Sequence, residues 1–89
     1  MFTKKLSKIE VKCGLIRFGV ADKDFFPANG ETIVMIDNHG EEYITHVHRT
    51  ACRIDGLTAM HHNNNAHEGT SVAIQKIDGR KNAYKVIYQ

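Results

Sequence analysis

The sequence is poor in the residues that mark several classes of protein. Its 89 residues contain two cysteines, one proline and no tryptophan. Cys13 and Cys52 lie far apart and in no C-x-x-C pattern, so they support neither the disulfide framework of a secreted domain nor a cysteine-based zinc site. No run of about 18 apolar residues occurs, which argues against a membrane-spanning helix. We therefore expect a protein of a reducing compartment: the cytoplasm, at the nucleoid in a bacterium, or the nucleus in a eukaryote.

Motifs typical of enzymes are also missing. The chain has no phosphate-binding G-x-x-x-x-G-K loop and no dinucleotide-binding G-x-G-x-x-G loop. Neither Ser7 nor Ser71 lies in a nucleophile elbow, and neither cysteine belongs to a Cys-His signature. A chain of this length buries one thin core and leaves no room for a deep active site. We expect no catalytic activity and no required cofactor.

Short β-branched runs separated by turn residues dominate the chain, of which 42% is hydrophobic. This pattern is typical of strands, which we predict at residues 9–13, 15–20, 32–36, 42–48, 71–77 and 84–88. The turn sequences at residues 37–40 and 78–80 predict two antiparallel hairpins. Residues 21–26 and 55–62 each have an aspartate near their start and a helix breaker behind them, so we predict two short helices there.

These elements predict a mostly β fold in a single domain that covers residues 1–89. A sheet in so small a domain avoids free edges by closing on itself. We therefore expect a small open barrel or pseudobarrel of about six to seven strands with two short helices. The side chains that we assign to its core are Phe18, Phe25, Phe26, Val34, Ile36, Tyr43, Val72, Ile74 and Val86.

Charge is unevenly distributed along the chain, although the net charge is only +2. Residues 1–30 carry six basic and three acidic side chains, residues 31–45 carry none and four, and residues 46–89 carry six and three. Two basic stretches around an acidic middle suit a protein that contacts a polyanion with one face. The alternative is that these charges only solvate the surface.

The basic side chains gather in two clusters, one early in the chain and one in mid-chain. The first cluster contains Lys4, Lys5, Lys8, Lys12 and Arg17, and the second contains His46, His48, Arg49 and Arg53. Lysine and arginine attract DNA phosphates, and arginine, histidine and threonine can read base edges in the major groove from a ribbon or from paired loops. The aromatic residues lie where a core needs them, which argues against a stacking surface for RNA or single strands.

All six histidines lie between His39 and His67. His46 and His48 share one face of a predicted strand, because side chains alternate along a strand. A zinc site would join this pair to the later histidines His61, His62 and His67. No helical His-Glu-x-x-His motif and no nearby cysteine accompanies them, so we favour surface histidines and predict no metal site.

Three blocks of sequence, in order and covering most of the chain, carry a resemblance to a known family. The first is Lys-Leu-Ser-Lys-Ile-Glu-Val at residues 5–11, and the second is the apolar strand, short helix and Phe-Pro ending of residues 15–27. The third runs from the hairpin at residues 37–43 through Gly56-Leu57 to the strand entry at residues 68–74. Together they resemble the B3-type DNA-binding pseudobarrel of plant B3 transcription factors and of effector domains in some bacterial restriction endonucleases.

The chain departs from the pattern of that family at several positions. The usual Ile-Pro-Lys of the second strand reads Ile-Arg-Phe-Gly at residues 16–19, so a phosphate-contacting lysine is missing there. Tyr43 stands where a tryptophan is common, and Leu57 replaces an aromatic residue. The segment between them is shorter than in the plant members, which bears on the size and reach of the second arm.

The resemblance implies two arms that grip the major groove of double-stranded DNA and read a short site. The first arm would be residues 8–14, and the second would be residues 45–53. Lys8 and Lys12 are expected to hold phosphates, whereas Arg49 and Arg53 are expected at base edges, because a guanidinium can engage guanine O6 and N7 together. The complete set of expected DNA-binding residues is Lys8, Lys12, Arg17, His46, His48, Arg49, Thr50 and Arg53.

The predicted function is therefore sequence-specific binding of double-stranded DNA without catalysis. Such a module would serve a restriction system, beside a nuclease domain or another protein partner, or it would be a small regulator of transcription. The alternative is a small β-barrel adaptor or inhibitor that binds protein and does not bind nucleic acid. Protonation of His46 and His48 below about pH 6.5 is expected to strengthen DNA binding.

Overall fold

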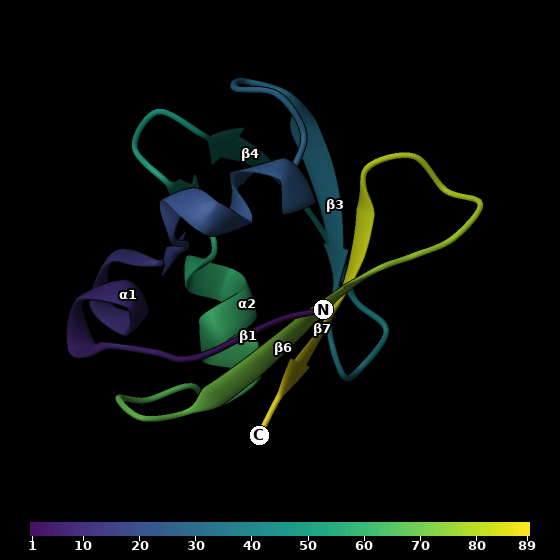
Figure 1. Cartoon of the computed structure of the whole chain (residues 1–89). Coiled ribbons are helices and arrows are strands. Elements are labelled where there is room, and N and C mark those ends of the chain that lie inside the picture. Colours follow the sequence, from purple (N-terminus) through teal and green to yellow (C-terminus); the bar gives the residue numbers. More distant parts are fainter.

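The computed structural model describes all residues, 1–89, as a twisted half-barrel of seven strands with three short helices (Figure 1). The strands are β1 (Phe2–Lys5), β2 (Ile16–Arg17), β3 (Thr32–Ile36), β4 (Glu42–His48), β5 (Arg53–Asp55), β6 (Ser71–Lys76) and β7 (Ala83–Tyr88). The helices are α1 (Lys8–Cys13), the 3₁₀ helix η1 (Val20–Phe25) and α2 (Thr58–Asn63). The mostly β, open pseudobarrel predicted from the sequence is confirmed. No helix is long and apolar enough to cross a membrane.

The strands form one sheet in the order β1-β6-β7-β3-β4-β5-β2. Both predicted hairpins are present as the antiparallel pairs β3–β4 and β6–β7. The two hairpins meet through a parallel pairing of β3 with β7, and every other pairing is antiparallel. Strands β1 and β5 were not predicted, because three or four residues carry too little periodicity to stand out from a loop.

The prediction of a strand at residues 9–13 is wrong, because these residues belong to helix α1. Ser7 caps the helix with its side chain, and Glu10 bonds back to the amide of Ser7, which together form a capping box. Gly14 ends the helix with a left-handed φ of 67°. These caps satisfy amides and carbonyls that the ends of a short helix otherwise leave without partners, and they outweigh the β-branched residues in between. The strand predicted at residues 15–20 is likewise cut to β2 by the start of η1.

The predicted core is correct for Phe18, Phe26, Val72, Ile74 and Val86 and wrong in strand β3. Ile33 and Met35 are fully buried, whereas Val34 and Ile36 face outward and are only half-buried. The run Thr-Ile-Val-Met-Ile offers apolar side chains to both faces, so the sequence cannot decide which face turns inward. Phe25 and Tyr43 are also only half-buried and pack at the margin of the core.

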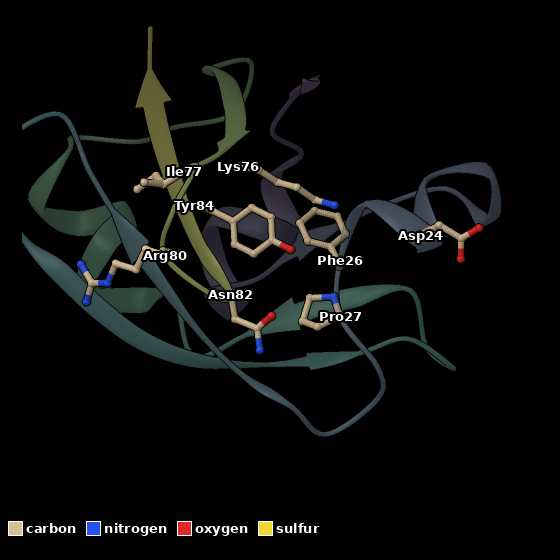
Figure 2. A pocket seen from close by; sticks show the side chains of 9 residues that line it. Asp24, Phe26, Pro27, Lys76, Ile77, Arg80, Asn82 and Tyr84 are labelled. Carbon is tan, nitrogen blue, oxygen red and sulfur yellow. The ribbon is translucent and has the colours of Figure 1, made fainter.

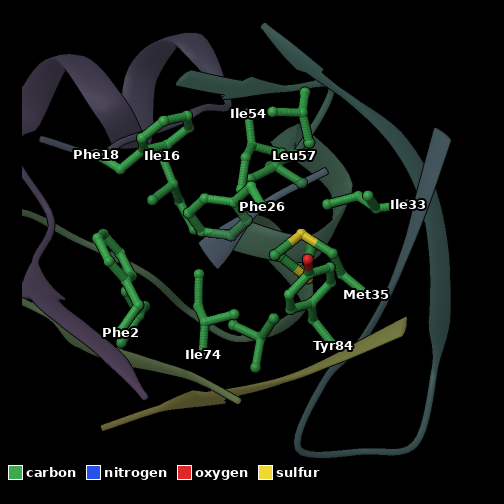
Figure 3. Close-up of a cluster of buried hydrophobic side chains, with 14 of the residues drawn as sticks. Phe2, Ile16, Phe18, Phe26, Ile33, Met35, Ile54, Leu57, Ile74 and Tyr84 are labelled. Atoms are coloured by element: carbon green, nitrogen blue, oxygen red, sulfur yellow. The ribbon is translucent and has the colours of Figure 1, made fainter. Parts of the chain in front are cut away.

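Side chains from both ends of the chain fill the barrel (Figure 3). Phe26 lies at the centre of an aromatic group, with ring centroids 4.7 Å from Phe18 and 5.7 Å from Phe2. Helix α2 closes the opposite side of the interior with Leu57 at its start and Met60, both of which are fully buried. The core thus joins side chains of both edge strands, β1 and β2, to side chains of the central strand β3.

An ion pair closes the gap between the two edge strands, β1 and β2. Lys4 on β1 lies 2.7 Å from the Glu10 carboxylate and donates a hydrogen bond of 3.0 Å to the carbonyl of Arg17 on β2. The amide of Arg17 donates a hydrogen bond of 2.7 Å to Glu10 Oε2, the same oxygen that Lys4 contacts. The pair therefore takes the place that a neighbouring strand would occupy on the free edge of β2, and it fixes α1 against the sheet.

Candidate nucleic-acid interface

Three of the predicted DNA-binding residues form a row across adjacent strands. Arg17 of β2 is paired with Arg53 of β5, and Arg53 is paired with His48 of β4. All three side chains are exposed, while the next row, Ile16, Ile54 and Val47, is fully buried. Because neighbouring strands lie about 4.8 Å apart, the row spans about 10 Å of the outer sheet surface. We call these three residues the cationic row.

Asp55 lies beside the cationic row and binds two of its members. Arg53 Nε lies 3.0 Å from Asp55 Oδ1, and His48 Nε2 lies 3.0 Å from Asp55 Oδ2. These contacts use one edge of the guanidinium. The side chain of Arg53 is 44% exposed, so its remaining N–H groups face solvent. His46 is opposite Asp55 on β4 and shares this outer face.

Lys8 and Lys12 lie on α1, not on the extended arm that was predicted for residues 8–14. They are four residues apart on a helix, which brings their side chains to the same side. Both are exposed, and neither forms an ion pair. The end of α1 is attached to the start of α2, since the amide of Leu57 donates to the carbonyl of Gly14 at 2.7 Å.

Arg49 and Thr50 lie in the loop between β4 and β5. Thr50 is exposed at the turn, while Arg49 is held against the helix η1 and the turn that follows it. The guanidinium of Arg49 lies 2.9 Å from Asp24 Oδ1, and its backbone amide donates to Asn29 Oδ1 at 2.9 Å. Asp24 thus engages one of the five N–H groups of this guanidinium, and the role predicted for Arg49 at a base edge stays a prediction.

The helix α1 and the β4–β5 loop lie at opposite ends of the β2–β5 ribbon (Figure 1). One end of the ribbon is fixed by the bond between Leu57 and Gly14, and the other by the bond from the amide of Phe18 to the carbonyl of Cys52, at 2.9 Å. From Gly14 to Phe18 the chain advances four residues, which corresponds to about 13 Å at about 3.3 Å per residue. The structure thus places the two predicted arms at the two ends of the β2–β5 ribbon, one on either side of the cationic row.

Two buried titratable groups lie behind this surface. Burial alone raises the pKa of Glu10, but the hydrogen bonds from Lys4 and from the amides of Arg17 and Ser7 outweigh it and hold the pKa below its usual value. Burial lowers the pKa of His61, against a smaller opposite effect of its bond to the carbonyl of Leu15. Glu10 therefore stays charged and His61 stays neutral near pH 7.

The histidines do not come together. His61 is buried in α2, where its ring nitrogens lie 2.7 Å from the hydroxyl of Tyr88 and 3.1 Å from the carbonyl of Leu15. His46 and His48 lie on the outer face of β4, and no group of three or more histidine, cysteine or acidic side chains is placed to hold a metal ion. The helical spacing of Leu57, Met60 and His61 is the sequence signal for burial that the prediction missed.

A separate pocket of about 240 Å³ lies beside the β6–β7 hairpin (Figure 2). Its walls combine the rings of Phe26 and Tyr84 with Lys76 and Asn82, while Arg80 at its margin lies 2.8 Å from Glu42. Tyr84 donates its hydroxyl hydrogen to the carbonyl of Phe25. None of the predicted DNA-binding residues lines this pocket.

Comparisons with known proteins identify the fold. No protein-family model and no curated protein sequence matches the chain. Among solved structures, it is 18% identical to the hypothetical Arabidopsis thaliana protein At1g16640.1, with a TM-score of 0.75 over 99% of this chain and 87% of that one. The Arabidopsis FUS3–DNA complex gives 17% identity and a TM-score of 0.75, over 99% of this chain and 94% of that one. The N-terminal domain of Helicobacter pylori LlaJI.R1 gives 12% identity and a TM-score of 0.74, over 97% of this chain and 77% of that one.

These likenesses confirm the B3-type pseudobarrel fold that the three sequence blocks predicted. They extend over nearly the whole chain, so the resemblance is not limited to one hairpin or one motif. The contacts of individual residues with DNA are not tested by them, and the eight predicted DNA-binding residues stay predictions.

Proposed function

We propose that this protein binds double-stranded DNA in a sequence-specific manner through the major groove. The observation that carries the proposal is the exposed cationic row of Arg17, Arg53 and His48 between two projections that bear further cations. One structure of similar fold, that of FUS3, is a complex with DNA, which supports the same use of this fold here.

The dimensions of the interface suit the major groove. The two points at which the projections are attached to the β2–β5 ribbon lie about 13 Å apart, and the major groove is about 12 Å wide. In this arrangement, Lys8 and Lys12 hold phosphates on one side of the groove, and Thr50 and the backbone of the loop approach the other side. Arg53 has free N–H groups at the centre of the row and reads base edges.

The chain acts in this proposal as a recognition module without a catalytic step. It serves either a restriction system, in which a nuclease domain supplies cleavage, or a small regulator of transcription. The LlaJI.R1 domain and FUS3 are both below 20% identity. The fold does not favour one over the other.

Selection from a randomised duplex pool tests the proposal directly. We expect a defined motif to be enriched, and we expect Arg53→Gln to lower the preference for that motif by about 1–3 kcal/mol. Lys8→Gln combined with Lys12→Gln should weaken binding to all duplexes equally and reduce the salt dependence by about two phosphate contacts.

Lys85→Gln is the matched control, because Lys85 is exposed on β7 and has no ion pair. A pool that shows no enrichment, with no duplex retained at low salt, would refute the proposal. In that case the alternative of a protein-binding adaptor is tested by pull-down.

A further inference from the structure

Asp24 reaches across from η1 to the β4–β5 loop and occupies the guanidinium of Arg49. The two side chains come from elements 25 residues apart and meet at 2.9 Å. The Asp24 side chain is fully exposed, whereas that of Arg49 is 30% exposed, and Arg49 Nε is buried without a hydrogen-bond partner. Asp24 also belongs to the residues that line the pocket beside the β6–β7 hairpin, and Figure 2 shows it on η1 at the edge of that group. No packing requirement explains a carboxylate at this position.

Asp24 differs from the other acidic residue of the interface. Asp55 lies on β5 itself, is 34% exposed and binds both Arg53 and His48, so it is part of the sheet surface. Asp24 contacts the interface through Arg49 alone. The loop also has its own anchor in the hydrogen bond that the amide of Arg49 donates to Asn29 Oδ1, which does not depend on Asp24.

We propose that Asp24 limits the affinity of the β4–β5 loop for DNA phosphates by holding the guanidinium of Arg49. The inference rests on the proposed function and adds a residue that the sequence analysis did not identify. Two effects combine: the cation is shared with a carboxylate, and the carboxylate itself repels phosphate. Because binding without sequence preference depends on cations that displace counterions, one withheld arginine lowers this component of binding. Asp24 thereby favours duplexes whose bases contribute contacts over duplexes that offer phosphates alone.

The test uses the full chain and a fluorescent duplex of arbitrary sequence, so that the unknown target site is not needed. We expect Asp24→Asn to raise the affinity about fivefold at low salt, as expected for one exposed charge interaction at short range. The dependence of log K on log salt should steepen by about 0.9, the contribution of one additional phosphate contact.

Asp22→Asn is the matched control, because Asp22 lies on the same exposed helix and forms no ion pair. It removes the same charge without releasing an arginine, so its effect on affinity should be smaller and its salt dependence unchanged. In an Arg49→Gln background, Asp24→Asn should have no more effect than Asp22→Asn. The thermal midpoints of all variants should agree, which separates binding from folding.

Three outcomes overturn the inference. Equal gains for Asp22→Asn and Asp24→Asn would mean that only overall charge matters. An undiminished gain in the Arg49→Gln background would mean that Asp24 does not act through Arg49. A loss of affinity in Asp24→Asn would mean that the ion pair orders the loop for binding. If the wild-type protein and every variant fail to bind the duplex, it is the proposed function that fails.

Discussion

Replacement of Glu10 by alanine tests the closure of the barrel between β1 and β2. The carboxylate of Glu10 is 1% exposed and receives hydrogen bonds from the amides of Ser7 and Arg17 and from Lys4. Truncation leaves two backbone amides without partners, at about 1–3 kcal/mol each. Lys4 is partly exposed and recovers most of its solvation. We therefore expect a loss of about 2–5 kcal/mol in the free energy of unfolding, a large part of the 5–15 kcal/mol typical of a domain.

Urea denaturation followed by circular dichroism measures this loss. Glu68→Ala serves as the control, because Glu68 is exposed and makes no side-chain contact, and it should change stability by less than about 0.5 kcal/mol. A large shift in the urea midpoint with an unchanged slope would show that the native state has lost stability without a change in its compactness. If Glu10→Ala costs less than about 1 kcal/mol, water replaces the carboxylate at the gap, and the reasoning that the ion pair closes the barrel is refuted.

Three further predictions concern stability. Gly14→Ala should lower the free energy of unfolding by about 2–5 kcal/mol, because φ is left-handed and the new methyl group overlaps the backbone of Thr58. Gly40→Ala is the control, since it has a similar φ but open space around it, and it should cost only about 1–2 kcal/mol. Equal losses of stability in thermal unfolding would contradict this prediction. Because the pKa of His61 is lowered in the native state, the unfolded chain binds a proton first as pH falls below about 6.5. The free energy of unfolding should therefore decline from about pH 6.5 towards pH 5. In a pH series of urea midpoints, His61→Gln should flatten this decline. Glu10 and Asp37 both have lowered pKa values, Asp37 because hydrogen bonds from Asn64 and nearby amides outweigh the effect of its burial. Their contribution to the free energy of unfolding is therefore present above about pH 4.5 and is lost as pH falls through the native pKa values. A Glu10→Gln variant as acid-sensitive as the wild type would refute the contribution of Glu10.

The interface combines a rigid frame with charges that are already partly engaged. The strands β4, β5 and β2 hold Arg17, Arg53 and His48 at fixed spacing, since their inward neighbours are fully buried. Asp55 neutralises part of that charge, and Asp24 neutralises part of the charge of Arg49 in the adjacent loop. Under the proposed function, such a surface would bind a polyanion less strongly than free arginines would, and it would leave more of the discrimination to contacts with the bases.

Local sequence determined the hairpins and the composition of the core. The β-branched runs and the turns between them placed β3–β4 and β6–β7 correctly, because pairing between neighbouring strands requires only local patterning and turn chemistry. The order and spacing of three blocks also indicated the fold, since glycine, aromatic and capping residues are needed at fixed positions along it. The capping box that makes α1 a helix was present in Ser7 and Glu10, but the prediction gave more weight to the β-branched residues.

Contacts between distant segments were decided by the tertiary structure alone. The inward face of β3 depends on its register with β4, because its own residues are apolar on both faces. The short strands β1 and β5 exist only because β6 and β4 pair with them. The partner of Arg49 follows from where η1 comes to lie, and no spacing in the sequence specifies it, whereas Arg53 and Asp55 are two residues apart on one strand and share a face. The sequence by itself thus determined which residues carry the charge, and the packing of segments far apart in the chain determined which of those charges are free.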